Sequence, residues 1–177
     1  MSNIFPPITF SYDRALEIGK AAEHLVCTDL LLAGYRAFLA DQGLPYDVIA
    51  DVDGKLLRIQ VKSVIKARNV NSQGRNKRIC YSFCVRRRGK DGVKRLSDTD
   101  CDIVALVSLD IRTVAYLPIK YVAQTVYLRS TDDQLETRPN RKSWGAKITD
   151  FPFVAAIDSE FDYSFAIREW VDSRRGI

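Results

Sequence analysis

Residues 46–62 have the sequence YDVIADVDGKLLRIQVK, in which two strand-like runs flank an Asp-Gly pair. Asp-Gly between runs of this kind is a strong signal for a hairpin with a two-residue turn. With Asp53 and Gly54 as the turn, the register of the two strands places Asp47 directly opposite Gln60. The sequence therefore predicts an antiparallel hairpin that brings these two polar side chains together.

The two faces of this hairpin differ in polarity. Successive side chains of a strand point to opposite faces, so Lys62 shares a face with Gln60 and Asp47. The other face is apolar and carries Val48, Ala50, Leu57, Ile59 and Val61. We expect the apolar face to pack on the core and the polar face to hold a site.

A helix is predicted over residues 13–33, with Asp13 or Ser11 near its start and Gly34 as its stop. Its apolar residues lie nearly all round the helix axis, so we expect a central, covered helix. Glu23 is the single charged residue between Ala21 and Thr28. A lone charge in such a stretch is a candidate functional residue.

The remaining chain predicts more strands than helices. Strands are expected at residues 35–40, 79–85, 103–109 and 113–117, a terminal helix at 161–172, loops at 64–78 and 131–147, and a turn region at 86–95. Residues 121–128 fit either a helix or a strand.

Together these acids, the glutamine and the lysine suit metal-assisted hydrolysis of a phosphodiester. Mg²⁺ prefers oxygen ligands and keeps several waters, so few protein ligands are needed. Asp47 is the expected primary ligand, joined by the amide oxygen of Gln60 and the backbone carbonyl of Val61. Glu23 completes the acidic side, and Lys62 orients or deprotonates the attacking water and offsets charge on the phosphate.

Three segments resemble the motifs of the PD-(D/E)XK nucleases. Residues 19–26 (GKAAEHLV) resemble the first-helix motif, 46–49 (YDVI) the metal-binding aspartate and 60–63 (QVKS) the (D/E)xK element. The QxK form and the sequence of residues 50–63 are most similar to those of homing endonucleases encoded in group I introns of cyanobacteria. The resemblance covers roughly residues 13–120.

This resemblance implies an α/β (α+β) fold, with a mixed central β-sheet flanked by helices. It also implies that Glu23, Asp47, Gln60 and Lys62 are catalytic and that Mg²⁺ is the cofactor, with Mn²⁺ as a substitute. Gln60 departs from the commoner pattern, which has a carboxylate there. The metal site is therefore expected to carry one negative charge fewer, for which Glu23 can compensate.

The charge of the chain is unevenly distributed. Residues 54–90 contain 12 Lys and Arg and no Asp or Glu, although the whole chain has a net charge of only +5. Such runs are usually solvated surface, but this one adjoins the candidate site and suits contacts to DNA phosphates and bases. The expected DNA-binding residues are Lys66, Arg68, Asn69, Asn71, Gln73, Arg75, Lys77, Arg78, Arg86, Arg87, Arg88 and Lys90.

Length and composition exclude several classes of protein. The 177 residues predict one nuclease domain, with a catalytic core at about 13–120, DNA-binding insertions at about 64–95, and elements at 121–177 for DNA contact or oligomerisation. With His24 as its only histidine, the chain lacks the side chains for a usual zinc site or His-based triad. The four cysteines form no CxxC pair and are expected to be reduced and buried.

The sequence thus favours a Mg²⁺-dependent, site-specific DNA endonuclease of the homing type. A homodimer or homotetramer is expected, because cutting both strands of a duplex needs two active sites or two successive events. A Holliday junction resolvase, a restriction enzyme, a noncatalytic DNA-binding module with a decayed site and a structural protein with incidental basicity are the alternatives. Without a signal peptide or membrane span, a soluble cytoplasmic protein is expected.

Overall fold

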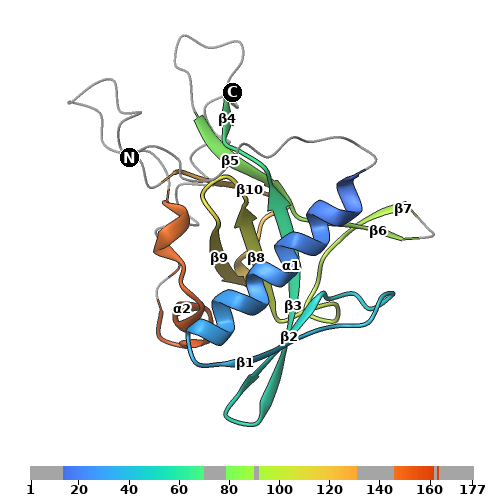
Figure 1. The fold of residues 1–177 in the computed structure, drawn as a ribbon, viewed down its shortest axis with the longest axis vertical. Coiled ribbons are helices and arrows are strands. Elements are labelled where there is room, and N and C mark those ends of the chain that lie inside the picture. The colour runs from blue at the N-terminus through green and yellow to red at the C-terminus, as the bar shows by residue number, and fades with distance from the viewer. Residues whose placement is uncertain (1–13, 70–78, 90–91, 131–145, 162, 164–177) are drawn as a thin grey trace.

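A mixed five-stranded sheet is the centre of the protein, in a computed structural model that describes residues 14–69, 79–89, 92–130, 146–161 and 163 (Figure 1). Its order is β1-β2-β3-β8-β9, with β3 and β8 parallel and the other pairs antiparallel. The strands are β1 (Arg36–Leu39), β2 (Val48–Val52), β3 (Lys55–Val64), β8 (Ile103–Ser108) and β9 (Thr113–Pro118). A mixed sheet with flanking helices is the fold class that the sequence predicts.

The predicted hairpin is formed by β2 and β3 in the expected register. Val48 pairs with Ile59 and Val52 with Lys55. The turn residues Asp53 and Gly54 have φ angles of 53° and 85°, which a two-residue hairpin turn of type I′ requires at both positions. The predicted apolar face is buried, so the register prediction is confirmed.

Helix α1 (Ala15–Leu32) packs on one face of this sheet (Figure 1). Its buried residues Ala22, Val26 and Leu30 recur every fourth position and form a narrow stripe against the strands. The prediction of a helix covered all round is wrong, because Leu16 and Leu32 are 86% and 85% exposed. A flat sheet contacts only one side of a helix, so the outer leucines face solvent.

A second layer covers the opposite face of the central sheet. It is a three-stranded sheet of order β10-β5-β4, formed by β4 (Arg68–Asn69), β5 (Ile79–Cys84) and β10 (Thr125–Leu128). Tyr81 and Phe83 of β5 pack there against Val104 and Leu106 of β8, whereas Ala105 of β8 points to the α1 side. Strand β8 is therefore buried between two hydrophobic cores.

Several smaller elements differ from the sequence predictions. They are the hairpin of β6 (Arg86–Gly89) and β7 (Gly92–Arg95), the 3₁₀ helices η2 (Ile119–Tyr121) and η4 (Ile148–Asp150), and α2 (Phe153–Ile157). The predicted turn region at 86–95 is thus a strand pair, and the ambiguous residues 121–128 end in β10. The helix expected at 161–172 falls almost entirely outside the described residues.

Two further predictions concern the burial of the cysteines and the absence of a membrane span. All four cysteines are free, but Cys84 is exposed and Cys27 is partly exposed, so the expectation of uniform burial is wrong. Cys84 is the last residue of β5, beyond the core residue Phe83, whereas Cys80 on the same face lies farther inside the strand and is buried. Within the described residues, no helix is long and apolar enough to cross a membrane.

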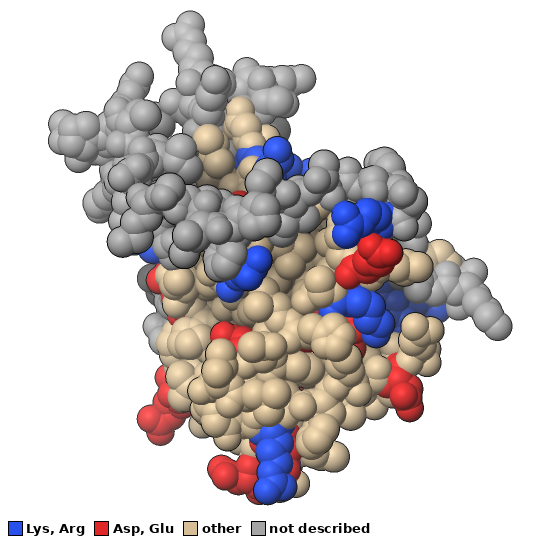
Figure 2. Space-filling model, viewed as in Figure 1, with Lys and Arg blue, Asp and Glu red and all other residues tan. Residues whose placement is uncertain are grey.

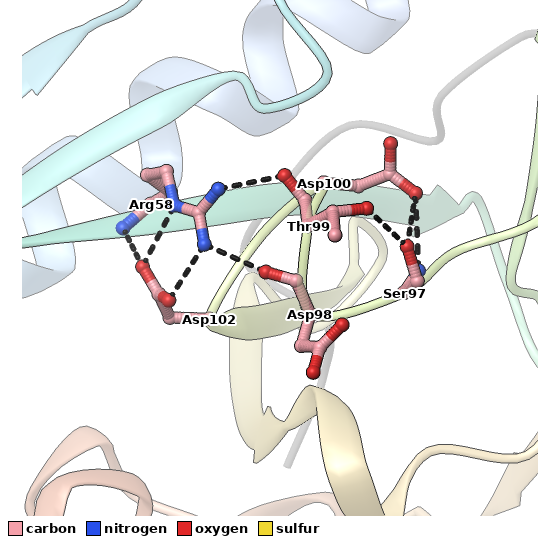
Figure 3. A network of polar contacts seen from close by, with 6 residues as sticks. All are labelled: Arg58, Ser97, Asp98, Thr99, Asp100 and Asp102. Atoms are coloured by element: carbon pink, nitrogen blue, oxygen red, sulfur yellow. Dashed lines mark hydrogen bonds and ion pairs between the residues drawn. The ribbon is translucent and has the colours of Figure 1, made fainter.

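An ion pair fastens β3 to the loop before β8 (Figure 3). The Arg58 guanidinium lies 2.9 Å from Asp102 Oδ1 and donates to the backbone carbonyls of Asp98 and Thr99 at 2.7 and 2.8 Å. The Arg58 backbone N–H also donates to Asp102 Oδ2 at 2.8 Å. Burial raises the pKa of Asp102, but the Arg58 contacts outweigh it and leave that pKa below its ordinary value.

Asp102→Asn is expected to lower the free energy of unfolding by about 1–2 kcal/mol at pH 7, because Arg58 loses a charged, partly exposed acceptor. A depressed folded-state pKa stabilises the fold above the unfolded pKa and ceases to do so as the pH falls through the folded value. The difference should therefore shrink below about pH 4 in urea unfolding. Asp98→Asn is the matched control, since Arg58 uses only its backbone carbonyl; an equal loss in both variants would contradict the assignment.

Candidate active site

The candidate site lies where β2 and β3 separate. Asp47, immediately before β2, donates its backbone N–H to the carbonyl of Ile59 at 2.9 Å and so extends the hairpin by one residue. Beyond this point β3 continues to Val64 without β2 beside it. Residues 60–62 of β3 therefore have no residue of β2 paired with them.

The Asp47 carboxylate lies beside this part of β3. Its Oδ2 accepts the backbone N–H of Val61 at 2.7 Å and a short hydrogen bond from Gln60 Nε2. Gln60 is 8% exposed, and its Nε2 is also 3.4 Å from the Val61 carbonyl oxygen. The structure thus brings Asp47, Gln60 and Val61 together as the hairpin register predicted.

Charge and burial act on Asp47 in opposite directions. Burial and the nearby Glu23 raise its pKa, whereas the Val61 N–H, Lys62 and Lys20 lower it. The net shift is upward, so the carboxyl is harder to ionise than an exposed aspartate. Divalent cations favour the ionised form, so this site is poised to gain from binding one.

Lys62, on β3, is close enough to Asp47 for their charges to interact. Burial lowers its pKa, and the Asp47 charge only partly opposes that shift. A lysine whose pKa is lowered has a larger neutral fraction near neutral pH than an exposed one. It can therefore take a proton from a bound water or, when charged, face a phosphate oxygen.

Glu23 is a residue of α1 whose charge reaches Asp47. Its carboxylate Oε2 lies 2.7 Å from Lys20 Nζ, and the side chains of Glu23 and Lys20 are 15% and 43% exposed. The Glu23 charge raises the pKa of Asp47, so the two acids interact across the site. Lys20 was not predicted to be a site residue, although its i,i+3 spacing from Glu23 is a signal that indicates their contact.

The donor set fits a hard divalent cation. Asp47 and Glu23 supply carboxylate oxygens, and Val61 supplies a backbone carbonyl. Gln60 turns its Nε2 toward Asp47, so half a turn of the amide would present Oε1 instead. The described residues contain no group of three or more His, Cys, Asp and Glu side chains that could hold a metal.

The predicted DNA-binding residues are only partly described. Lys66, Arg68 and Asn69 are exposed after β3, and Arg86 is exposed on β6, whereas Arg87 is paired with Asp100 at 2.5 Å. The backbone of Arg88 lies in β6. Asn71, Gln73, Arg75, Lys77, Arg78 and Lys90 lie outside the described residues.

The surface charge is uneven on the visible face in Figure 2. Asp and Glu side chains lie mainly over the lower half of this face, whereas Lys and Arg side chains occur from its top to its bottom edge. Arg87 differs from its exposed neighbours because its ion pair with Asp100 already offsets its charge.

Gln60→Glu is expected to destabilise the metal-free protein at pH 8, because it replaces a donor to Asp47 by a second carboxylate. The loss should be about 1–2 kcal/mol, or about 2–8 °C in Tm. Added Mg²⁺ should raise the Tm of the variant more than that of the wild type. Thermal unfolding in EDTA and in Mg²⁺ measures both effects.

Gln42→Glu is the matched control, since it makes the same change of charge at an exposed loop position. It should leave the Tm in EDTA and the response to Mg²⁺ nearly unchanged. Equal behaviour of the two variants would show that Gln60 does not face Asp47 in the protein.

Comparison with known proteins adds independent findings. A family model described as PD-(D/E)XK endonuclease matches residues 15–147. The fold is similar to that of a solved bacterial homing endonuclease, I-Ssp6803I, with a TM-score of 0.51 and 18% sequence identity, over 71% of this chain and 84% of that chain. A search of curated proteins found no match.

Proposed function

Because this chain belongs to the PD-(D/E)XK endonuclease family, we propose that it is a Mg²⁺-dependent DNA endonuclease that cuts at specific sites, as a homing endonuclease. The observation that carries this proposal is the contact of Asp47 with Gln60 and the Val61 backbone, beside Lys62. Likeness to a bacterial homing endonuclease in fold supports the finer assignment.

Four residues would hold the cation. Asp47 is its principal ligand, the Gln60 amide oxygen and the Val61 carbonyl lie on the same strand edge, and Glu23 closes the site from α1. Bound Mg²⁺ supplies a Lewis acid at the phosphate and lowers the pKa of a water. Mn²⁺, which also accepts oxygen ligands, should substitute for it.

Lys62 acts on the water and on the phosphate. The water oxygen attacks phosphorus and gives a proton to Lys62 or to solvent, the bond from phosphorus to the leaving sugar oxygen breaks, and that oxygen takes up a proton from solvent. The lowered pKa of Lys62 makes it a better acceptor of that proton than an exposed lysine. A charged Lys62 instead offsets the negative charge that develops on the pentacovalent phosphate.

Lys62→Ala is expected to slow DNA cleavage in Mg²⁺ by at least about 100-fold, because it removes the proton acceptor or the charge that faces the phosphate. Asp47→Ala should abolish cleavage while DNA binding is retained. Lys55→Ala, at an exposed position beside the hairpin turn, is the control and should cut at the wild-type rate. Cleavage by Lys62→Ala at the wild-type rate would sink the catalytic assignment.

DNA binding is proposed for the basic segments around residues 66–95. Exposed Lys66, Arg68 and Arg86 attract phosphates without sequence preference, whereas Asn, Gln and Arg side chains can read base edges. With about six phosphates contacted, affinity should fall roughly a thousandfold between 50 and 200 mM salt. Fluorescence anisotropy of a labelled duplex measures this slope, and a slope near zero would contradict the proposed interface.

Cutting both strands at one place requires two active sites or two successive events. We therefore propose a two-fold homodimer or a homotetramer, in which residues 121–177 contact DNA or another subunit and the catalytic core is residues 13–120. Mapping the ends of host-locus DNA after incubation with Mg²⁺ tests the site-specific assignment. Preference for branched over linear DNA would indicate a junction resolvase, and plasmid nicking that is equal with and without EDTA would contradict a metal-dependent enzyme.

A further inference from the structure

Lys20 is a second lysine at the candidate site, and none of the roles proposed above uses it. Its ammonium lies 2.7 Å from Glu23 Oε2. Lys20 also interacts with Asp47, so one cation faces both acids. The charges of two lysines, Lys20 from α1 and Lys62 from β3, thus act on Asp47.

Exposure distinguishes the two members of the ion pair. The Glu23 side chain is 15% exposed, whereas that of Lys20 is 43% exposed. The ammonium is therefore the member of the pair that is more accessible to a phosphate in solution. No other Lys or Arg occurs within α1, residues 15–32.

We propose that Lys20 is a phosphate-binding residue of this site, held by Glu23 in the metal-free protein and released to a DNA phosphate when Glu23 faces a divalent cation. This inference rests on the proposed function. An ammonium has three donors and no fixed plane, so it can exchange a carboxylate oxygen for a phosphate oxygen with a small movement. Lys20 thus keeps a nearly buried carboxylate neutralised until the cation does so.

The same helix supplies a matched control. Arg14 and Glu17 form an i,i+3 ion pair at 3.0 Å, but their side chains are 59% and 70% exposed. Arg14→Ala and Lys20→Ala therefore remove the same charge from the same kind of pair. Only the second change leaves a partly buried partner, 15% exposed, whose charge acts on Asp47.

The first measurement is the affinity for a 30-base-pair duplex of arbitrary sequence in Ca²⁺, which also takes oxygen ligands. Lys20→Ala should bind about three- to tenfold more weakly at 100 mM salt, with a log–log salt slope smaller by about one. Lys20→Arg should restore binding, and Arg14→Ala should match the wild type. Equal affinities and slopes for Lys20→Ala and Arg14→Ala would overturn the proposal.

The second measurement is thermal unfolding without DNA. In EDTA at pH 8, Lys20→Ala should have a lower Tm than Arg14→Ala, and Mn²⁺ should raise its Tm by more, because the cation replaces the missing ammonium. Equal Tm shifts of the two variants would contradict the proposed interaction of Lys20 with Glu23 in the metal-free protein. A wild-type protein that neither binds nor cuts DNA would instead refute the proposed function, while this arm would still test the Lys20–Glu23 pair.

Discussion

The hydrogen bond from the Val61 backbone N–H to the Asp47 carboxylate is the contact on which the site depends. Strand β3 continues for several residues beyond its last pair with β2. A buried backbone N–H left without a partner at that point would destabilise the sheet. The aspartate side chain takes the place of the missing strand. The same carboxylate is thereby fixed beside Gln60 and Lys62, so a structural requirement of the sheet also builds the polar site.

Glutamine at position 60 has a physical rationale in this arrangement. A carboxylate there would face Asp47 across the strand pair, and two ionised acids in contact repel each other. An amide can donate to Asp47 when no cation is present and offer its oxygen when one is, because it carries both kinds of group. The site therefore keeps its geometry in the metal-free protein with fewer negative charges.

The sequence was most informative where contacts are local. The Asp53-Gly54 turn determines the register of the hairpin, and this register in turn predicts which side chains meet Asp47. Helix α1 was located correctly, but its exposure was not, because periodicity shows which residues are apolar and not how many layers cover them. The pairing of Lys20 with Glu23 follows from their i,i+3 spacing, but the interaction of Lys20 with Asp47 depends on how the helix packs on the strands, which no local pattern encodes.

Parallel pairing of β3 with β8 sets the order in which this site can assemble. The Asp47–Val61 contact joins residues 14 apart in the sequence, whereas the Arg58–Asp102 contacts join residues 44 apart. Closing the longer loop costs more chain entropy, and non-local pairings of this kind slow folding. The β2–β3 hairpin and helix α1, which packs mainly on β1 and β3, can thus come together before the more distant pairing of β3 with β8 forms.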